Sequence, residues 1–99
     1  MKTKDEIIDF LRQNRNILSE QYHISKIGLF GSFARDEQRL GSDVDLLIEM
    51  DDDVCGVHDL KESLRKYLSD SFGVGVDIAR EKYLKPYAKE QIMRDVVYV

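Results

Sequence analysis

The segment from residue 44 to 50 constrains the fold more than any other part of this chain. It reads Val-Asp-Leu-Leu-Ile-Glu-Met and is nearly continuously apolar from Val44 to Ile48. Such a run is typical of a central strand that helices cover on at least one face. A central strand needs neighbouring strands and a covering layer, so the remaining residues must supply both.

Short helices and strands are expected on either side of this strand. Thr3 and Glu6 form the pattern of a capping box, which predicts a helix over 4–20 whose apolar residues fall near one face. Pro86 fits the first turn of a last helix, where its missing N–H does no harm. The other expected elements are a strand over 24–30, a helical turn over 32–37, a loop over 40–42, a helix over 57–70, a strand over 75–79 and a terminal strand or tail over 96–99.

This order of elements predicts the fold class. Short strands and helices that alternate favour an α/β (α+β) architecture, with a small mixed β-sheet backed by helices. With 99 residues the default is a single domain over 1–99, and a hydrophobic share of 42% supplies one modest core. The charged share of 34% is that of an ordinary folded protein rather than a disordered one.

Composition also excludes several classes of function. The net charge of −4 argues against a broad basic surface for duplex nucleic acid. No apolar run is long enough for a membrane span, and the first residues lack the apolar core of a signal peptide. Cys55 is the one cysteine, so neither an intramolecular disulfide nor a thiolate zinc site can form. We therefore expect a cytoplasmic protein without a membrane or duplex nucleic-acid partner.

Gly31 and Ser32 form a candidate phosphate site. The expected strand ends at Phe30, the chain turns through glycine, and a helical turn follows. Backbone N–H groups at a helix start have no partner within the helix, and a small residue lets a phosphate approach them. The Ser32 hydroxyl adds a donor, and Arg35 lies about one turn further on, where it can reach phosphate oxygens. This is not the Walker pattern, because Gly-x-x-x-x-Gly-Lys-Ser/Thr is absent.

Asp43 and Asp45 form a candidate metal site. Side chains two residues apart on a strand point to the same face, so the two carboxylates lie close together and repel. Either one takes up a proton or a cation binds between them. Ligands that are all oxygen and strongly charged suit Mg²⁺ or Mn²⁺. Asp77 offers a third carboxylate, if its strand pairs beside the first, and three such groups can hold two metal ions.

Each of these features is weak by itself, because Gly-Ser pairs and Asp-x-Asp pairs are common in ordinary turns and at strand edges. Their combination resembles a known family. Gly31-Ser32, ten intervening residues and Asp43-Val44-Asp45 match the signature of the DNA polymerase beta-like nucleotidyltransferases. Residues 29–35, 42–49 and the stretch from 76 to 87 resemble the minimal nucleotidyltransferase (MNT) group, and the resemblance covers essentially the whole chain.

The resemblance implies a role for each of these residues. Asp43 and Asp45 would bind two Mg²⁺ ions, with Mn²⁺ as a substitute, and Asp77 would hold the catalytic metal and help deprotonate the attacking hydroxyl. The nucleotide would bind at Gly31, Ser32, Arg35 and Ser42, with its β- and γ-phosphates on Gly31 and Ser32. One position departs from the MNT pattern: Asp36 stands where the group commonly has glycine. If that position needs a positive φ, aspartate is tolerated better than most residues, though not freely.

The resemblance also implies a reaction and a partner. The chain would transfer AMP from ATP to a hydroxyl, expected to be a tyrosine, of a HEPN-family ribonuclease toxin, and would thereby act as its antitoxin. Two alternatives stay open. The chain could neutralise the toxin by covering it without catalysis, or it could modify a small molecule such as an aminoglycoside. Enzymes of the latter kind usually carry an additional helical domain, which we do not expect in a chain of 99 residues.

Other residues that often carry chemistry are expected to be bystanders here. His23 and His58 lie far apart in sequence without metal-ligand spacing, and Cys55 falls in a turn. Tyr83, Tyr87 and Tyr98 gather near the C-terminus, where core packing or a partner surface is expected before base stacking.

Overall fold

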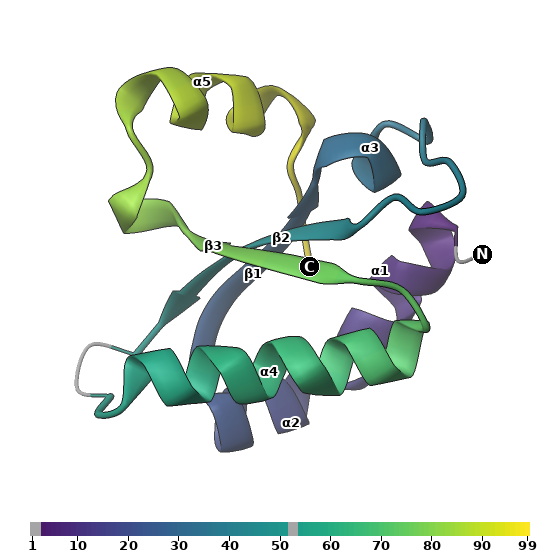
Figure 1. The fold of residues 1–99 in the computed structure, drawn as a ribbon. Coiled ribbons are helices and arrows are strands. Elements are labelled where there is room, and N and C mark those ends of the chain that lie inside the picture. Colours follow the sequence, from purple (N-terminus) through teal and green to yellow (C-terminus); the bar gives the residue numbers. More distant parts are fainter. Residues whose placement is uncertain (1–2, 52–53) are drawn as a thin grey trace.

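The computed structural model describes residues 3–51 and 54–99, which form one mixed four-stranded sheet with helices on both faces (Figure 1). The strands lie in the order β3-β2-β1-β4. In chain order the elements are α1 (Lys4–Gln13), α2 (Arg15–Tyr22), β1 (Ile24–Phe30), α3 (Gly31–Ala34), β2 (Val44–Met50), α4 (Val57–Phe72), β3 (Val76–Arg80), a 3₁₀ turn η1 (Glu81–Tyr83), α5 (Pro86–Asp95) and β4 (Val97–Tyr98).

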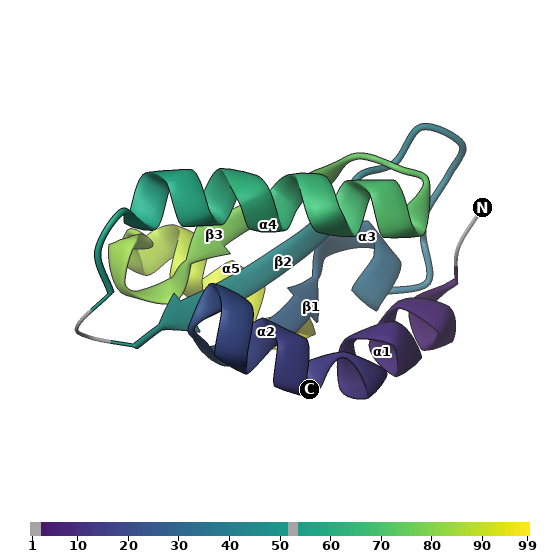
Figure 2. The ribbon, with the colours of Figure 1, turned by 90° about the horizontal axis from the view of Figure 1, so that it is seen from below.

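The pairing of the strands places β2 in the middle of the sheet. β2 runs antiparallel to β1 on one side and parallel to β3 on the other, while the short β4 runs antiparallel to the far side of β1. The parallel pair requires a crossover, which α4 provides. Figures 1 and 2 show α1, α2 and α4 over one face of the sheet, and α5 over the other.

The two faces of β2 differ in chemistry. Val44, Leu46, Ile48 and Met50 alternate along the strand and belong to the main core beneath α1, α2 and α4. Leu47 is also buried but lies outside that core cluster, on the opposite face. Because strand side chains alternate, Asp45 and Glu49 share the face of Leu47. The polar residues of the central strand therefore lie on the side of the sheet that α5 covers.

One expected element was wrong: the single helix over 4–20 is two helices. The capping box at Thr3 and Glu6 is present, but the helix ends at Asn14. The Asn14 side-chain amide donates a hydrogen bond of 2.8 Å to the carbonyl oxygen of Phe10. Asparagine side chains compete with the backbone for such carbonyls and interrupt helices. A new helix then begins at Arg15.

The other elements lie close to their expected positions. β1 and β2 have the expected bounds, β3 is displaced by one residue, and the terminal segment forms the short strand β4. Gly73 ends α4 in the left-handed conformation, with φ of 72°. No helix within 3–51 or 54–99 is long and apolar enough to cross a membrane.

Candidate active site

Asp43, Asp45 and Asp77 lie together at one end of the two parallel strands. Asp45 is the second residue of β2 and Asp77 the second residue of β3, and the register pairs them directly. Neighbouring strands are about 4.8 Å apart, so paired side chains on the same face are neighbours. Asp43 precedes β2 by one residue. The sequence placed Asp77 in the site only if its strand pairs beside that of Asp45. The two strands do pair in this way.

Two glycines make room for these carboxylates. A Cβ atom on Gly31 would overlap the Oδ2 atom of Asp45, and a Cβ on Gly75 would overlap the Oδ1 atom of Asp43. Gly31 also has φ of 74°, a conformation that side chains other than glycine rarely adopt. The side chain of Asp45 therefore packs against the backbone of Gly31, and that of Asp43 against the backbone of Gly75. Gly75 was not predicted as part of the site. The sequence indicated Gly75 only as the first residue of the strand expected over 75–79.

The electrostatics of this cluster are unfavourable without a cation. Burial raises the pKa of Asp45 to about 6, and the neighbouring carboxylates of Asp77 and Asp43 push it in the same direction. Arg35 opposes the shift. A bound cation would relieve both causes, because it replaces lost hydration and neutralises the repulsion. The donor set, three carboxylates on one face, therefore fits a hard divalent ion.

The carboxylates are not gathered around one point. Among the residues that the structure describes, no three Asp, Glu, His or Cys side chains converge closely enough to hold a metal ion. Side-chain rotation, rather than backbone movement, would bring Asp45 and Asp77 onto a shared ion, because their backbones already lie in register.

The predicted phosphate site lies directly beside these carboxylates. β1 ends at Phe30, which pairs with Asp45, and α3 begins at the next residue, Gly31. The first N–H groups of a helix have no partner within it, so the backbone at Gly31 and Ser32 offers donors next to the acidic cluster. A triphosphate bound to those donors would lie beside the three carboxylates.

Arg35 and Ser42 are already engaged in other contacts. The Arg35 guanidinium donates from Nη1 to Asp95 at 2.8 Å and from Nε to Glu37 at 3.0 Å. The Ser42 hydroxyl oxygen accepts from the backbone N–H of Arg39 at 2.8 Å and thereby closes a turn. The pairing of Arg35 with Asp95 was not foreseen, since sixty positions separate the two residues. The roles of Arg35 and Ser42 at the nucleotide stay predictions.

A cavity of about 420 Å³ adjoins the phosphate site. Phe30, Gly31 and Arg35 form one wall, and Gln91, Ile92 and Asp95 of α5 contribute to the other. No local pattern in the sequence indicates that α5 lies here. The position of α5 over the sheet depends on the long-range pairing of β4 with β1.

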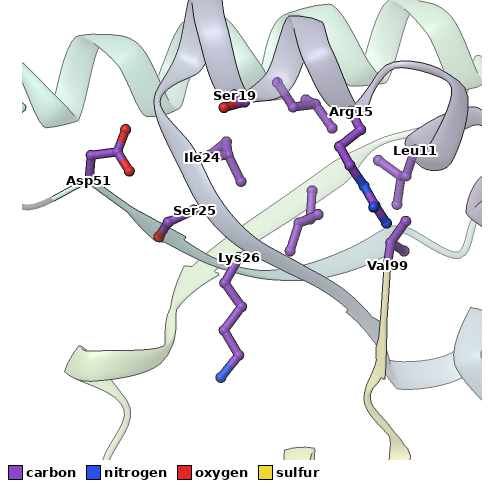
Figure 3. A pocket seen from close by; sticks show the side chains of 10 residues that line it. Leu11, Arg15, Ser19, Ile24, Ser25, Lys26, Asp51 and Val99 are labelled. Carbon is purple, nitrogen blue, oxygen red and sulfur yellow. The ribbon is translucent and has the colours of Figure 1, made fainter.

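A second cavity is unrelated to this cluster. Figure 3 shows it beside α2 and the start of β1, with Arg15, Lys26 and Asp51 around its mouth and Leu11 and Ile24 among its apolar walls. None of the predicted site residues lines it. His23 and Cys55 are exposed, and neither lines the carboxylate cluster. Tyr83 and Tyr87 are 71% and 74% exposed, so core packing is excluded for both.

Asp36 has φ of 56°, so the position where the MNT group commonly has glycine does require the left-handed conformation. We expect Asp36→Gly to leave the stability unchanged or raise it by up to about 1 kcal/mol, because relief of the strained φ offsets the greater freedom of the unfolded chain. Asp36→Ala should instead lower the stability by about 1 kcal/mol, since alanine keeps the Cβ and loses the polar side chain. Urea denaturation of the two variants measures the difference. Equal midpoints would show that the backbone here is not under strain.

Comparison with known proteins identifies the family. The model of the nucleotidyltransferase domain family matches residues 11–99, and the chain belongs to this family. Its members typically depend on a metal ion. A candidate protein adenylyltransferase from Methanocaldococcus jannaschii is 39% identical, and the match covers 100% of both chains. The protein adenylyltransferase MntA of Thermococcus cleftensis is 32% identical over 100% of this chain and 98% of its own.

Solved structures confirm the predicted fold class. A structure described as a minimal nucleotidyltransferase superposes with a TM-score of 0.71 and 31% identity, covering 91% of this chain and 93% of its own. The fold is also shared with a chain of a complex between tri-AMPylated Shewanella oneidensis HEPN toxin and MNT antitoxin. There the TM-score is 0.58 and the identity 19%, over 96% of this chain and 66% of the other.

Proposed function

We propose that this chain is a protein adenylyltransferase that transfers AMP from ATP to a hydroxyl group, a tyrosine in our proposal, of a HEPN-family toxin and so acts as its antitoxin. The observation that carries the proposal is the register of Asp45 with Asp77, directly beside the glycine turn at Gly31. Relatives that match along the full length of the chain bear the name protein adenylyltransferase. The same fold occurs in a complex of a tri-AMPylated HEPN toxin with an MNT antitoxin.

The proposed reaction is a displacement at the α-phosphorus of ATP. The acceptor oxygen forms a bond to that phosphorus while the bond to the β-phosphate oxygen breaks, and pyrophosphate leaves. The acceptor proton passes to the Asp77 carboxylate, which lies on the sheet face beside Asp45. Gly31 and Ser32 hold the β- and γ-phosphates through backbone N–H groups and the serine hydroxyl. Orientation of the two reactants and charge neutralisation supply most of the rate.

Asp43, Asp45 and Asp77 would hold two Mg²⁺ ions, with Mn²⁺ as a substitute. When bound, these ions neutralise the carboxylates and the triphosphate, which lowers the cost of bringing the two negative groups together. The requirement for a cation is supported by the raised pKa of Asp45, which reflects burial and repulsion by its acidic neighbours. We place the reaction in the cytoplasm, where ATP is available and the lone thiol of Cys55 stays reduced.

The proposal predicts that label from ATP reaches the toxin only from the α-phosphate. The chain is incubated with Mg²⁺, its HEPN-type partner and ATP labelled at either the α or the γ position. Transfer of α-label to the partner is expected. With Asp77→Asn the rate should fall at least about a hundredfold, because the amide cannot accept the hydroxyl proton. Glu20→Gln is the control: it removes an exposed carboxylate on α2, away from the cluster, and it should retain transfer.

Two results would contradict the proposal. Label from the γ-phosphate on the partner would indicate phosphorylation instead of AMP transfer. If the partner stays unlabelled but a small hydroxyl compound takes up α-label, the chain is a nucleotidyltransferase with a small-molecule acceptor.

A further inference from the structure

A third cavity, of about 620 Å³, lies beside β3, the start of α4 and the turn η1. Among the residues described, β3 pairs only with β2, so no strand covers its other edge. Figure 1 shows this end of β3 between the start of α4 and the turn η1. We call this cavity the β3 groove. It is lined by Val57 and Lys61 of α4, Ile78 and Arg80 of β3, and Tyr83 and Leu84 around η1.

The groove and the carboxylate cluster share the strand β3, although none of the three carboxylates lines the groove. Ile78 and Arg80 follow Asp77 on the same strand. At about 3.3 Å per residue, Arg80 lies roughly 10 Å from Asp77 along the strand. An extended chain that lies beside β3 with one hydroxyl at Asp77 would therefore reach Arg80 about three residues further on. The open edge of an end strand is a common place for such a segment to bind.

The groove carries positive charge that one nearby acid, Glu49, balances only in part. Lys61 and Arg80 are its lining lysine and arginine, and the Lys82 ammonium lies 5.3 Å from the Tyr83 ring centroid. The Arg80 side chain is only 10% exposed, and its Nη2 atom is 3.8 Å from Glu49, longer than a hydrogen bond. The Nε atom of Arg80 has no hydrogen-bond partner among the described residues. A cation with so few acceptors gains when a carboxylate arrives.

The occupant must therefore be partly apolar, extended and acidic. Ile78, Leu84 and the exposed ring of Tyr83 provide apolar contact surface. The basic residues favour a segment with an acid, although the whole chain has a net charge of −4. Such local complementarity selects a partner and sets its position along the edge more than it adds raw affinity.

We propose that the β3 groove binds an extended, acidic segment of the acceptor protein, with an acid near Arg80 and Lys61 and the acceptor hydroxyl at Asp77. This inference rests on the proposed AMP transfer to a protein, and it adds the part of the acceptor that the enzyme recognises.

Lys61→Glu tests the inference, with Lys66→Glu as the matched control. Both lysines lie on α4, but only Lys61 lines the groove. With the full chain, ATP, Mg²⁺ and the HEPN-type partner, Lys61→Glu should raise the KM for the partner about tenfold or more. It should leave the KM for ATP and the kcat within about twofold. Lys66→Glu should behave as the unchanged chain does. Replacing the acids within four residues of the acceptor hydroxyl by amides should have the same effect as Lys61→Glu.

An unchanged KM for the partner in Lys61→Glu would overturn the inference while leaving AMP transfer established. A raised KM for ATP instead would assign the groove to the triphosphate and would also overturn it. If the unchanged chain transfers no AMP at all, the proposed function fails. Calorimetric measurement of the affinity for the partner then tests the binding role of the groove separately. Affinity that is lost in Lys61→Glu but kept in Lys66→Glu supports this role, and equal affinities contradict it.

Discussion

Replacing Asp45 with Asn is expected to abolish AMP transfer and, at the same time, to stabilise the metal-free chain at pH 7. Both effects have the same cause. The Asp45 carboxylate is partly buried beside Asp43 and Asp77, which raises its pKa to about 6. An amide of the same shape removes the charge that is costly to bury, and with it the ligand that the reaction needs. We expect a gain of about 1–2 kcal/mol in the free energy of unfolding, discounted for partial exposure.

The stabilisation should depend on pH with a definite sign. Because the pKa of Asp45 is higher in the folded chain than the usual 3.8, the folded chain binds more protons between these values. The contribution of this group therefore favours the folded state at low pH and is lost as the pH rises through about 6. Urea denaturation of the metal-free chain at pH 4.5 and pH 7.5 should show Asp45→Asn more stabilised, relative to the unchanged chain, at the higher pH. An equal difference at both pH values would show that the Asp45 charge is not costly in the folded chain.

Mg²⁺ with a non-hydrolysable ATP analogue should remove most of that difference. A ligand that binds only the folded state raises the melting temperature, and it binds the unchanged chain but not the variant. In a domain of this size 1 kcal/mol corresponds to about 4–8 °C. The melting temperature of the unchanged chain should therefore rise by several degrees, and that of Asp45→Asn should not move. Equal shifts in both proteins would show that Asp45 does not hold the ion.

Gly31→Ala is expected to destabilise the chain strongly and to disrupt the phosphate site. Its φ of 74° costs an alanine about 1–2 kcal/mol, and the added Cβ would overlap Oδ2 of Asp45. Together we expect a loss of about 2–4 kcal/mol in the free energy of unfolding. Asp45 must move to admit the methyl group, so AMP transfer should fall with it.

Gly73→Ala separates the two contributions. Gly73 has nearly the same φ, 72°, but a Cβ there would meet no atom within 4 Å. The variant should lose only the backbone term, about 1–2 kcal/mol, and it should keep AMP transfer because Gly73 lies at the end of α4. Chemical denaturation of both variants gives the contact with Asp45 as the difference. If the two alanine variants lose the same free energy of unfolding, Asp45 does not lie as close to the turn at Gly31 as the structure indicates.

Local patterns in the sequence were sufficient for most of the fold. The apolar run of residues 44–50 specified the central strand, and Thr3 with Glu6 specified the start of the first helix. The end of that helix at Asn14 could not be predicted in this way. Asparagine also occurs within helices, and nothing in the local pattern shows that the Asn14 side chain bonds to the Phe10 carbonyl rather than to solvent.

The sequence predicted which residues of the candidate site lie near one another, but not what surrounds them. Strand geometry alone predicts that the side chains of Asp43 and Asp45, two residues apart, point to the same face. The register that brings Asp77 beside Asp45 depends instead on how α4 returns the chain to the sheet. The fit of Gly75 against Asp43, the bond from Arg35 to Asp95 and the groove beside β3 all join residues far apart in sequence. Periodicity and spacing carry no signal for such contacts.

The central claim is tested most directly by following the intact mass of the HEPN-type partner and its toxic ribonuclease activity in the same samples. With the unchanged chain, ATP and Mg²⁺, the mass should rise in steps of one AMP, and the activity should fall in proportion to the modified fraction. With Asp45→Asn both should stay at their starting values. If the variant silences the partner, or if the unchanged chain does so with no gain in mass, the chain neutralises its partner by covering it and AMP transfer is not its function.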